Sequence, residues 1–159
     1  MNEDNLLSQA GKANNRQFVV FNIGKEKYGV EISMVREIIK PKEITRIPNM
    51  PDYVEGVTNI RGQVTTVFNL RKRLGFPAME EMDKSGRIII VEYEGIPAGI
   101  LVDDVRDVKY ISDEEIDKVP SIISKSKGGK FLTGVGKIKD DLVLLIDLDK
   151  IFSFEDLNI

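Results

Sequence analysis

Residues 28–38 read YGVEISMVREI, and residues 98–108 read AGILVDDVRDV. At this offset of 70 positions a glycine, a valine and an arginine are identical, and the apolar positions correspond. Residues 53–74 match residues 131–152 at an offset of 78 positions, where eight residues have similar partners. The offset grows by eight through an insertion around 121–129 in the second copy. Such self-similarity indicates two copies of one supersecondary unit.

Local patterns predict about five short strands and one small helix in each copy. The aromatic and β-branched run at 18–21 and the YGV at 28–30 flank a charged turn at Gly24, which is typical of a hairpin. A second hairpin is predicted over 57–68, with its turn at Arg61-Gly62-Gln63. Asn69 can cap a short helix that stops at Gly75.

The predicted fold is all-β with short helices, built as two five-stranded barrels. We assign residues 1–16 to a flexible tail, 17–86 to the first barrel, and 87–159 to the second barrel with its terminal helix. A barrel of roughly 65 residues buries too little surface to be stable alone. The two barrels should therefore share an apolar seam and form one domain with a groove between its halves.

The composition narrows the function classes. Lysine and arginine total 23 against 26 acids, and no long stretch is dominated by basic residues. A nucleic-acid-binding barrel, the main alternative class, should show a basic stripe with interleaved aromatic residues, and none is evident. The chain has no cysteine and no histidine, so it lacks the commonest metal ligands and general base. We expect no metal, no cofactor and no catalysis, although a carboxylate-dependent hydrolase remains formally possible.

No segment resembles a signal peptide or a membrane span. The amino terminus carries acids where a signal peptide carries lysine or arginine. The longest apolar runs, at 88–91 and 142–146, are far shorter than the roughly 20 residues of a membrane-spanning helix. We expect a cytoplasmic protein with no direct membrane insertion.

A few residues could carry chemistry. Arg61, at a hairpin tip, can present its guanidinium to a partner carboxylate, or it can simply be solvated. The acid pairs 103–104 and 140–141 point their side chains to opposite faces, so we interpret them as solvated turn carboxylates. The segment 124–130 superficially resembles a phosphate-binding loop, but Phe131 follows Lys130 where a magnesium-binding Ser or Thr would stand.

Several motifs together point to one family. They are FVVF at 18–21, YGV at 28–30, VREI at 35–38, IPN at 47–49, GVTNIRG at 56–62, NLR at 69–71, GILVD at 99–103 and LTGVG at 132–136. In combination they closely resemble the CheW-type chemotaxis coupling proteins, from Gln17 to Phe152. The chain departs from the usual pattern at 65–69, where the family more often has an apolar residue and proline followed by aspartate.

The resemblance implies two SH3-like barrels and an adaptor that performs no catalysis. Such an adaptor bridges the cytoplasmic tip of methyl-accepting chemotaxis receptors and the regulatory domain of a CheA-type histidine kinase. It also implies a monomer outside the array that is recruited to membrane-associated receptor arrays, with no nucleic-acid partner.

The resemblance further implies which residues contact the partners. The receptor-side residues are Gly56, Asn59, Arg61, Val105 and Val108, and the kinase-side residues are Val35, Glu37 and Ile38. The strand valines and isoleucine among them could instead be ordinary core residues, and they mark a binding patch only where the outer face of the barrel is also apolar.

Overall fold

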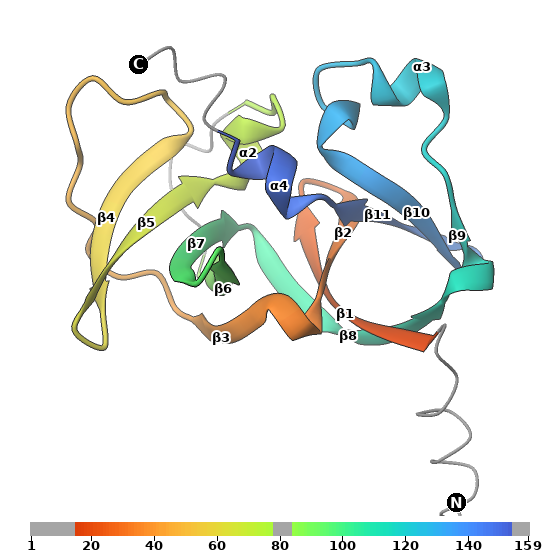
Figure 1. Ribbon diagram of the computed structural model, residues 1–159, viewed down its shortest axis with the longest axis horizontal. Helices are drawn as coiled ribbons and strands as arrows, with labels where there is room; N and C mark the ends of the chain where they lie inside the picture. The colour runs from red at the N-terminus through yellow and green to blue at the C-terminus, as the bar shows by residue number, and fades with distance from the viewer. Residues whose placement is uncertain (1–14, 78–83, 154–159) are drawn as a thin grey trace, which may run out of the picture.

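The protein folds into two curled β-sheets that lie side by side (Figure 1). The computed structural model describes residues 15–77 and 84–153. The six-stranded sheet has the order β8-β1-β2-β11-β10-β9, and the five-stranded sheet has the order β3-β6-β7-β5-β4. The six-stranded sheet comprises β1 (Asn15–Ile23), β2 (Glu26–Glu31), β8 (Asp104–Ser112), β9 (Ile116–Asp117), β10 (Leu132–Ile138) and β11 (Asp141–Ile146). The five-stranded sheet comprises β3 (Val35–Ile39), β4 (Val54–Ile60), β5 (Gln63–Asn69), β6 (Arg87–Tyr93) and β7 (Ile96–Val102).

The helices in the described residues are single turns. They are α2 (Leu70–Arg73), α3 (Ser121–Ser124), α4 (Leu148–Ile151) and the 3-10 turns Ile32–Met34, Asp113–Glu115 and Gly129–Phe131. The predicted all-β class with short helices is therefore confirmed.

The count of five strands per barrel is correct for one sheet only. In the other, Ser112 and Glu115 form a capping box that turns the chain, and Ile116 then pairs with Gly136 of β10. The neighbouring Gly134 lets Ile116 approach closely, because a Cβ there would lie 2.9 Å from its Cγ2. This contact adds the two-residue strand β9.

The strand β1 begins earlier than the predicted tail boundary at residue 16. Asn15 pairs with Ser112 and Arg16 pairs with Ile111, because β8 is long enough to extend the ladder. The rest of the predicted tail, residues 1–14, lies outside the described residues.

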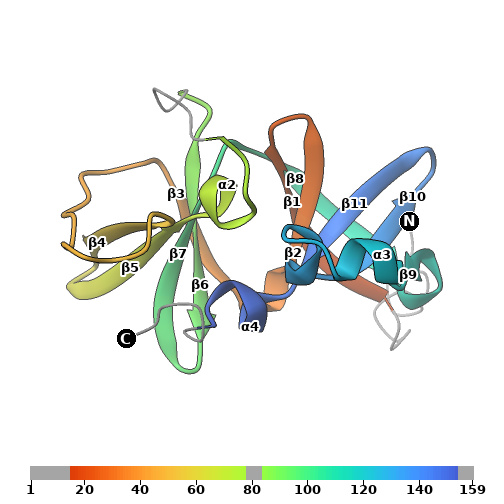
Figure 2. The same cartoon turned by 90° about the horizontal axis from the view of Figure 1, so that it is seen from above.

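The two repeats exchange their opening hairpins, and the predicted division at 86/87 is therefore not the division between the sheets. The β1–β2 hairpin lies between β8 and β11, which belong to the second repeat. The β6–β7 hairpin lies between β3 and β5, which belong to the first repeat. Both views show the red and orange hairpin among teal and blue strands, and the green hairpin beside yellow β5 (Figures 1 and 2).

Equivalent parallel pairings confirm the repeat. Leu145 of β11 pairs with Gly29 of β2, and Val67 of β5 pairs with Gly99 of β7. Gly29 corresponds to Gly99 at the offset of 70, and Val67 corresponds to Leu145 at the offset of 78. Both glycines allow close packing, since a Cβ at Gly99 would lie 2.9 Å from Ile88 Cγ2 and one at Gly29 would lie 3.1 Å from a Val143 methyl group.

Alternate residues of one strand enter different cores. Phe18 and Val20 of β1 pack inside the six-stranded sheet, whereas Val19, Phe21 and Ile23 enter a core shared by both sheets. This alternation follows from the two-residue period of a strand. Because both faces of the middle of β1 are buried, residues 18–21 form a continuous apolar run.

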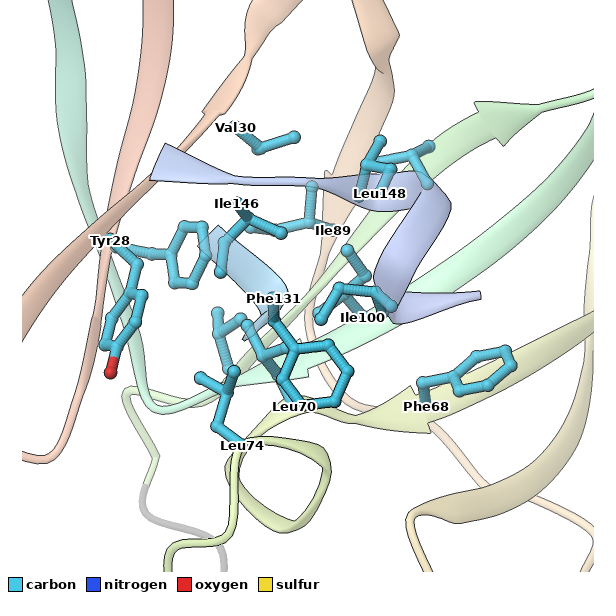
Figure 3. Close-up of a cluster of buried hydrophobic side chains, with 14 of the residues drawn as sticks. Tyr28, Val30, Phe68, Leu70, Leu74, Ile89, Ile100, Phe131, Ile146 and Leu148 are labelled. Carbon is cyan, nitrogen blue, oxygen red and sulfur yellow. The ribbon is translucent and has the colours of Figure 1, made fainter. Parts of the chain in front are cut away.

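The shared core confirms the predicted apolar seam. Figure 3 shows Tyr28 and Val30 of the six-stranded sheet together with Ile89 and Ile100 of the five-stranded sheet. Phe131 belongs to the same cluster and is 3% exposed. Fully burying an aliphatic or aromatic side chain stabilises a fold by about 1.5–3 kcal/mol. Separating the sheets would expose the whole cluster, so they form one cooperative unit.

Candidate functional site

The tip of the β4–β5 hairpin is a two-residue turn. Arg61 has φ 52° and Gly62 has φ 86°, as a type I′ turn requires. The side-chain oxygen of Asn59 accepts a hydrogen bond from the Gly62 N–H at 2.8 Å, which fixes the turn. The Arg61 side chain is 80% exposed, so its guanidinium stands at the surface.

Arg61 forms a two-point ion pair with Glu37 of β3. Its Nε lies 3.0 Å from Glu37 Oε2, and its Nη2 lies 3.3 Å from Glu37 Oε1. This hydrogen bonding lowers the pKa of the Glu37 carboxyl and raises the pKa of Arg61. Arg36 adds a second contact, 3.3 Å from its Nη1 to the Gln63 side-chain oxygen. The tip of the hairpin is therefore tied to β3, and we call this end of the five-stranded sheet the first mouth.

Residues predicted to contact the receptor and residues predicted to contact the kinase lie together at this mouth. Arg61 and Asn59 were assigned to the receptor and Glu37 to the kinase, yet Arg61 and Glu37 bond directly. On the same strand, Ile38 is 40% exposed and Val35 is half-buried against the shared core.

Gly56 is buried, so it offers no surface to a partner. A Cβ at this position would overlap the carbonyl oxygen of Thr45, and the residue has φ 141°. Its neighbour Val57 exchanges two backbone hydrogen bonds with Thr45, at 2.8 and 2.9 Å. The glycine therefore holds the 45–46 segment against β4, and any influence on a partner is exerted through that segment.

The remaining predicted residues lie on the other sheet. Val105 and Val108 belong to β8, the edge strand of the six-stranded sheet. Val105 is half-buried and packs against the shared core, whereas Val108 is 44% exposed. The structure thus brings Asn59, Arg61 and Glu37 together and places these two valines apart from them.

Sequence reasoning missed Lys42 and Arg36 at the first mouth. The Lys42 ammonium donates to the Asn59 carbonyl oxygen at 2.6 Å, so it supports the same turn. Arg36 lies within the quoted VREI motif, and its identity with Arg106 in the second repeat was the available signal. Nothing in the sequence pattern around Lys42 indicated its contact.

The predicted groove between the halves stays a prediction. A cavity of about 370 Å³ is lined mainly by the six-stranded sheet and α4, and among the described residues Tyr93 is its one lining residue from a strand of the five-stranded sheet. Its other lining residues include Val30, Leu145 and Leu148. Burial raises the pKa of the Tyr93 hydroxyl, and a hydrogen bond with Asp149 adds to the shift.

The acid pairs serve the fold, and one was misinterpreted. Asp103 is not a solvated turn residue, because its carboxylate accepts from Arg71 Nη2 at 3.0 Å and from the Gly24 N–H at 2.8 Å. Its side chain is 15% exposed. Asp141 is 61% exposed and pairs with Lys27 at 2.7 Å, which lowers the pKa of Asp141.

The described residues show no constellation for metal chemistry. Within 15–77 and 84–153, no group of three or more His, Cys, Asp or Glu side chains could hold a metal ion. No helix in these ranges is long and apolar enough to cross a membrane.

Comparison with known proteins supports the resemblance seen in the motifs. The family model described as CheW-like domain matches residues 17–156. The chain belongs to the CheW-like domain family. It is 32% identical to the chemotaxis protein CheW of Klebsiella aerogenes, over 93% of this chain and 88% of that protein. It is 36% identical to CheW of Helicobacter pylori, over 85% and 80% of the two chains.

A solved CheW structure shows the same fold. The crystal structure of the scaffolding protein CheW of Thermoanaerobacter tengcongensis aligns with a TM-score of 0.81 and 34% identity. The alignment covers 91% of this chain and 97% of the solved one. This match confirms the CheW-like pair of SH3-like barrels predicted from the resemblance.

Proposed function

We propose that this CheW-like chain is a chemotaxis adaptor, which couples methyl-accepting receptors to a CheA-type histidine kinase and catalyses no reaction itself. The family match over residues 17–156 carries this proposal. A solved relative described as a scaffolding protein supports it. The chain contains no histidine, so it cannot carry a phosphohistidine of its own.

The adaptor works by joint occupation of separate faces. Holding a receptor and a kinase on one rigid body raises the local concentration of the kinase at the receptor. Exposed residues on both sheets supply candidate faces, with Ile38 on the five-stranded sheet and Val108 on the six-stranded sheet. Neither contact needs to be tight, because affinity depends on buried anchors more than on area.

The receptor contributes its cytoplasmic tip and the kinase its regulatory domain, while the adaptor is a cytoplasmic monomer recruited to receptor arrays. The nucleic-acid-binding alternative is not favoured, because the matched relatives are chemotaxis proteins.

The predicted residue roles need one adjustment for the geometry. We retain Asn59, Arg61, Val105 and Val108 for the receptor and Val35, Glu37 and Ile38 for the kinase. Gly56 acts on the receptor side indirectly, because it is buried against the 45–46 segment. Since Arg61 and Glu37 bond each other, a partner that engages either side chain competes with the ion pair.

Reconstitution tests the function directly. Purified kinase and a receptor cytoplasmic fragment are assembled with and without this chain, and ATP turnover is measured with and without receptor stimulus. Receptor control of turnover should require the chain. Equal control in its absence would reject the adaptor role.

A matched pair of variants tests the residue roles. Arg61→Ala should weaken receptor binding by about tenfold while the thermal midpoint is kept. Lys84→Ala, in the turn before β6, removes an exposed lysine far along the chain from the hairpin and should leave binding unchanged. A folded Arg61→Ala protein that binds the receptor as well as the wild type would remove Arg61 from the receptor face.

A further inference from the structure

The equivalent end of the six-stranded sheet, at the turn between β10 and β11, is called the second mouth, and the equivalent ion pair is missing there. The repeat places Lys139 where the first copy has Arg61, and Asp107 where it has Glu37. The first positions of the two turns match, since φ is 55° at Lys139 and 52° at Arg61, but Asp140 does not share the positive φ of Gly62. Asp107 instead pairs with Lys109 of its own strand, at 3.4 Å. Within the described residues Lys139 makes no ion pair, so its charge is uncompensated.

A cavity of about 320 Å³ opens beside Lys139. Its rim has four cations and two acids, and its floor is apolar. The apolar residues of the floor are Val20, Ile138 and Val143. The charged residues of the rim are Lys27, Arg106, Lys109, Lys139, Asp107 and Asp141. The two acids are each engaged by a lysine, at 2.7 and 3.4 Å. A net positive charge therefore remains around an apolar floor.

The first mouth shows why the second one is open. There, Ile60 and Ile90 are buried in an interior cluster, and Ile39 packs against them. The repeat puts the smaller Val20 at the position of Ile90 and the charged Lys109 at the position of Ile39. The second mouth keeps Ile138 at the position of Ile60. It lacks the bulk of Ile90 and Ile39 and the closing ion pair.

The pKa shift of Asp141 agrees with the excess of cations around the cavity. The pKa of Asp141 is lowered by its hydrogen bond from Lys27, and Lys109 contributes to the same shift through space. Arg106 contacts Asp104 only at 3.5 Å and is 55% exposed, so much of its guanidinium stays available. An incoming carboxylate would meet several cations at once.

We propose that this second mouth is a docking pocket for an acidic side chain of a protein partner. The partner's carboxylate takes the place that Glu37 occupies in the first mouth, and Lys139 takes the role of Arg61. The apolar floor and the exposed Leu142 beside it, 59% exposed, suit a peptide segment better than a bare oxyanion. The inference rests on the proposed adaptor function, which supplies the partner proteins.

Charge reversal tests the pocket in the full-length chain. Binding of a receptor cytoplasmic fragment and of a kinase regulatory domain is measured for the wild type, Lys139→Glu and the control Lys84→Glu. Lys139→Glu should weaken one of the two partners by about tenfold, with a smaller loss at high salt because screening reduces the repulsion. Lys84→Glu should bind like the wild type, and thermal midpoints confirm that both variants are folded.

The outcomes separate this inference from the proposed function. A wild-type chain that binds neither partner rejects the adaptor function itself. A wild-type chain that binds, together with a Lys139→Glu chain that binds both partners equally well, rejects only the pocket.

Zero-length cross-linking identifies the contact. A carbodiimide joins a lysine ammonium group to a carboxylate as an amide with loss of water, and mass spectrometry locates the joined residues. A cross-link from Lys139 to an aspartate or glutamate of the bound partner is expected. Lys139→Arg should keep binding but lose the cross-link. Saturable binding of inorganic phosphate at Lys139, with no partner cross-link, would instead show a small-anion site and overturn the proposal.

Discussion

Arg73 of α2 donates a hydrogen bond from Nε to the backbone carbonyl of Ile151, the last residue of α4, at 3.0 Å. Its Nη2 also donates to the Lys150 carbonyl at 3.0 Å. The guanidinium lies over the rings of Tyr53 and Phe131, at 4.2 and 4.6 Å from their centroids. The residue is 7% exposed. Because α2 and α4 are equivalent helices of the two repeats, one buried cation joins the repeats at their ends.

Removing this cation should destabilise the whole protein. Arg73→Met keeps apolar bulk but leaves the last carbonyls of α4 without donors, which we expect to cost about 3 kcal/mol. Arg46→Met, at an exposed position, is the control and should change the unfolding free energy by less than about 0.5 kcal/mol. Denaturant titration measures both, and equal midpoints would show that the Arg73 contacts do not matter.

The exchanged hairpins predict that the two halves cannot fold apart. Residues 15–86 and 87–153 each carry strands whose neighbours lie in the other half. Expressed separately, each half should lack a cooperative thermal transition. Co-expressed, they should associate and recover one transition, as measured by calorimetry and size-exclusion chromatography. A cooperative transition in either isolated half would contradict this expectation.

Gly56→Ala should be strongly destabilising. The added methyl group overlaps the Thr45 carbonyl and must adopt φ 141°, so a loss of about 3 kcal/mol is expected. Gly75→Ala provides the control, because Gly75 also has positive φ, at 91°, but has open space around it. It should lose only about 1 kcal/mol. Similar losses in the two variants would mean that backbone strain, not the Thr45 contact, decides the effect.

Asn69 tests the departure from the family pattern. Its amide donates to Glu55 Oε1 at 2.8 Å, while its carbonyl oxygen caps α2 by accepting from the Lys72 N–H. Asn69→Asp keeps the cap but places two carboxylates together, and should cost about 1–2 kcal/mol. Adding Glu55→Gln should restore stability, because the glutamine amide can donate to the new carboxylate. Failure of this rescue in denaturant titrations would argue against the pairing.

The Arg61–Glu37 pair predicts a specific pH response. Because its pKa is lowered in the folded state, Glu37 stabilises the fold above the ordinary glutamate pKa, and this contribution is lost as pH falls through the lowered value. Arg61→Ala should move the Glu37 carboxyl pKa up toward its ordinary range, as followed by carbon NMR. The thermal midpoint should change by no more than about 2 °C, since exposed pairs contribute little. An unchanged Glu37 titration would contradict the contact.

Local chemistry predicted much of this fold. The turn at Arg61-Gly62, the Asn69 cap and the repeat offsets were readable because each depends on neighbouring residues or on simple periodicity. The hairpin exchange was not readable, since two similar copies present the same strand patterns and nothing local selects which copy pairs with which. The boundary at 86/87 failed for that reason.

Site residues were harder to predict for a related reason. Gly56 was expected at a surface, but its burial depends on Thr45, eleven positions earlier in sequence and across an isolated bridge. That Lys139 lacks an ion-pair partner in the described part of the chain could not be predicted, because it depends on Asp107 pairing with Lys109 instead. Sequence offsets could align these positions, but they could not reveal which carboxylate each cation binds.

The exchanged hairpins also determine how the molecule responds to force. Two short chain connections, from β2 to β3 and from β7 to β8, run between the sheets, and the shared core packs against both of them. A displacement of one sheet should therefore move the other sheet with it. Two partners bound at opposite ends of the chain would therefore be held in a fixed orientation relative to each other.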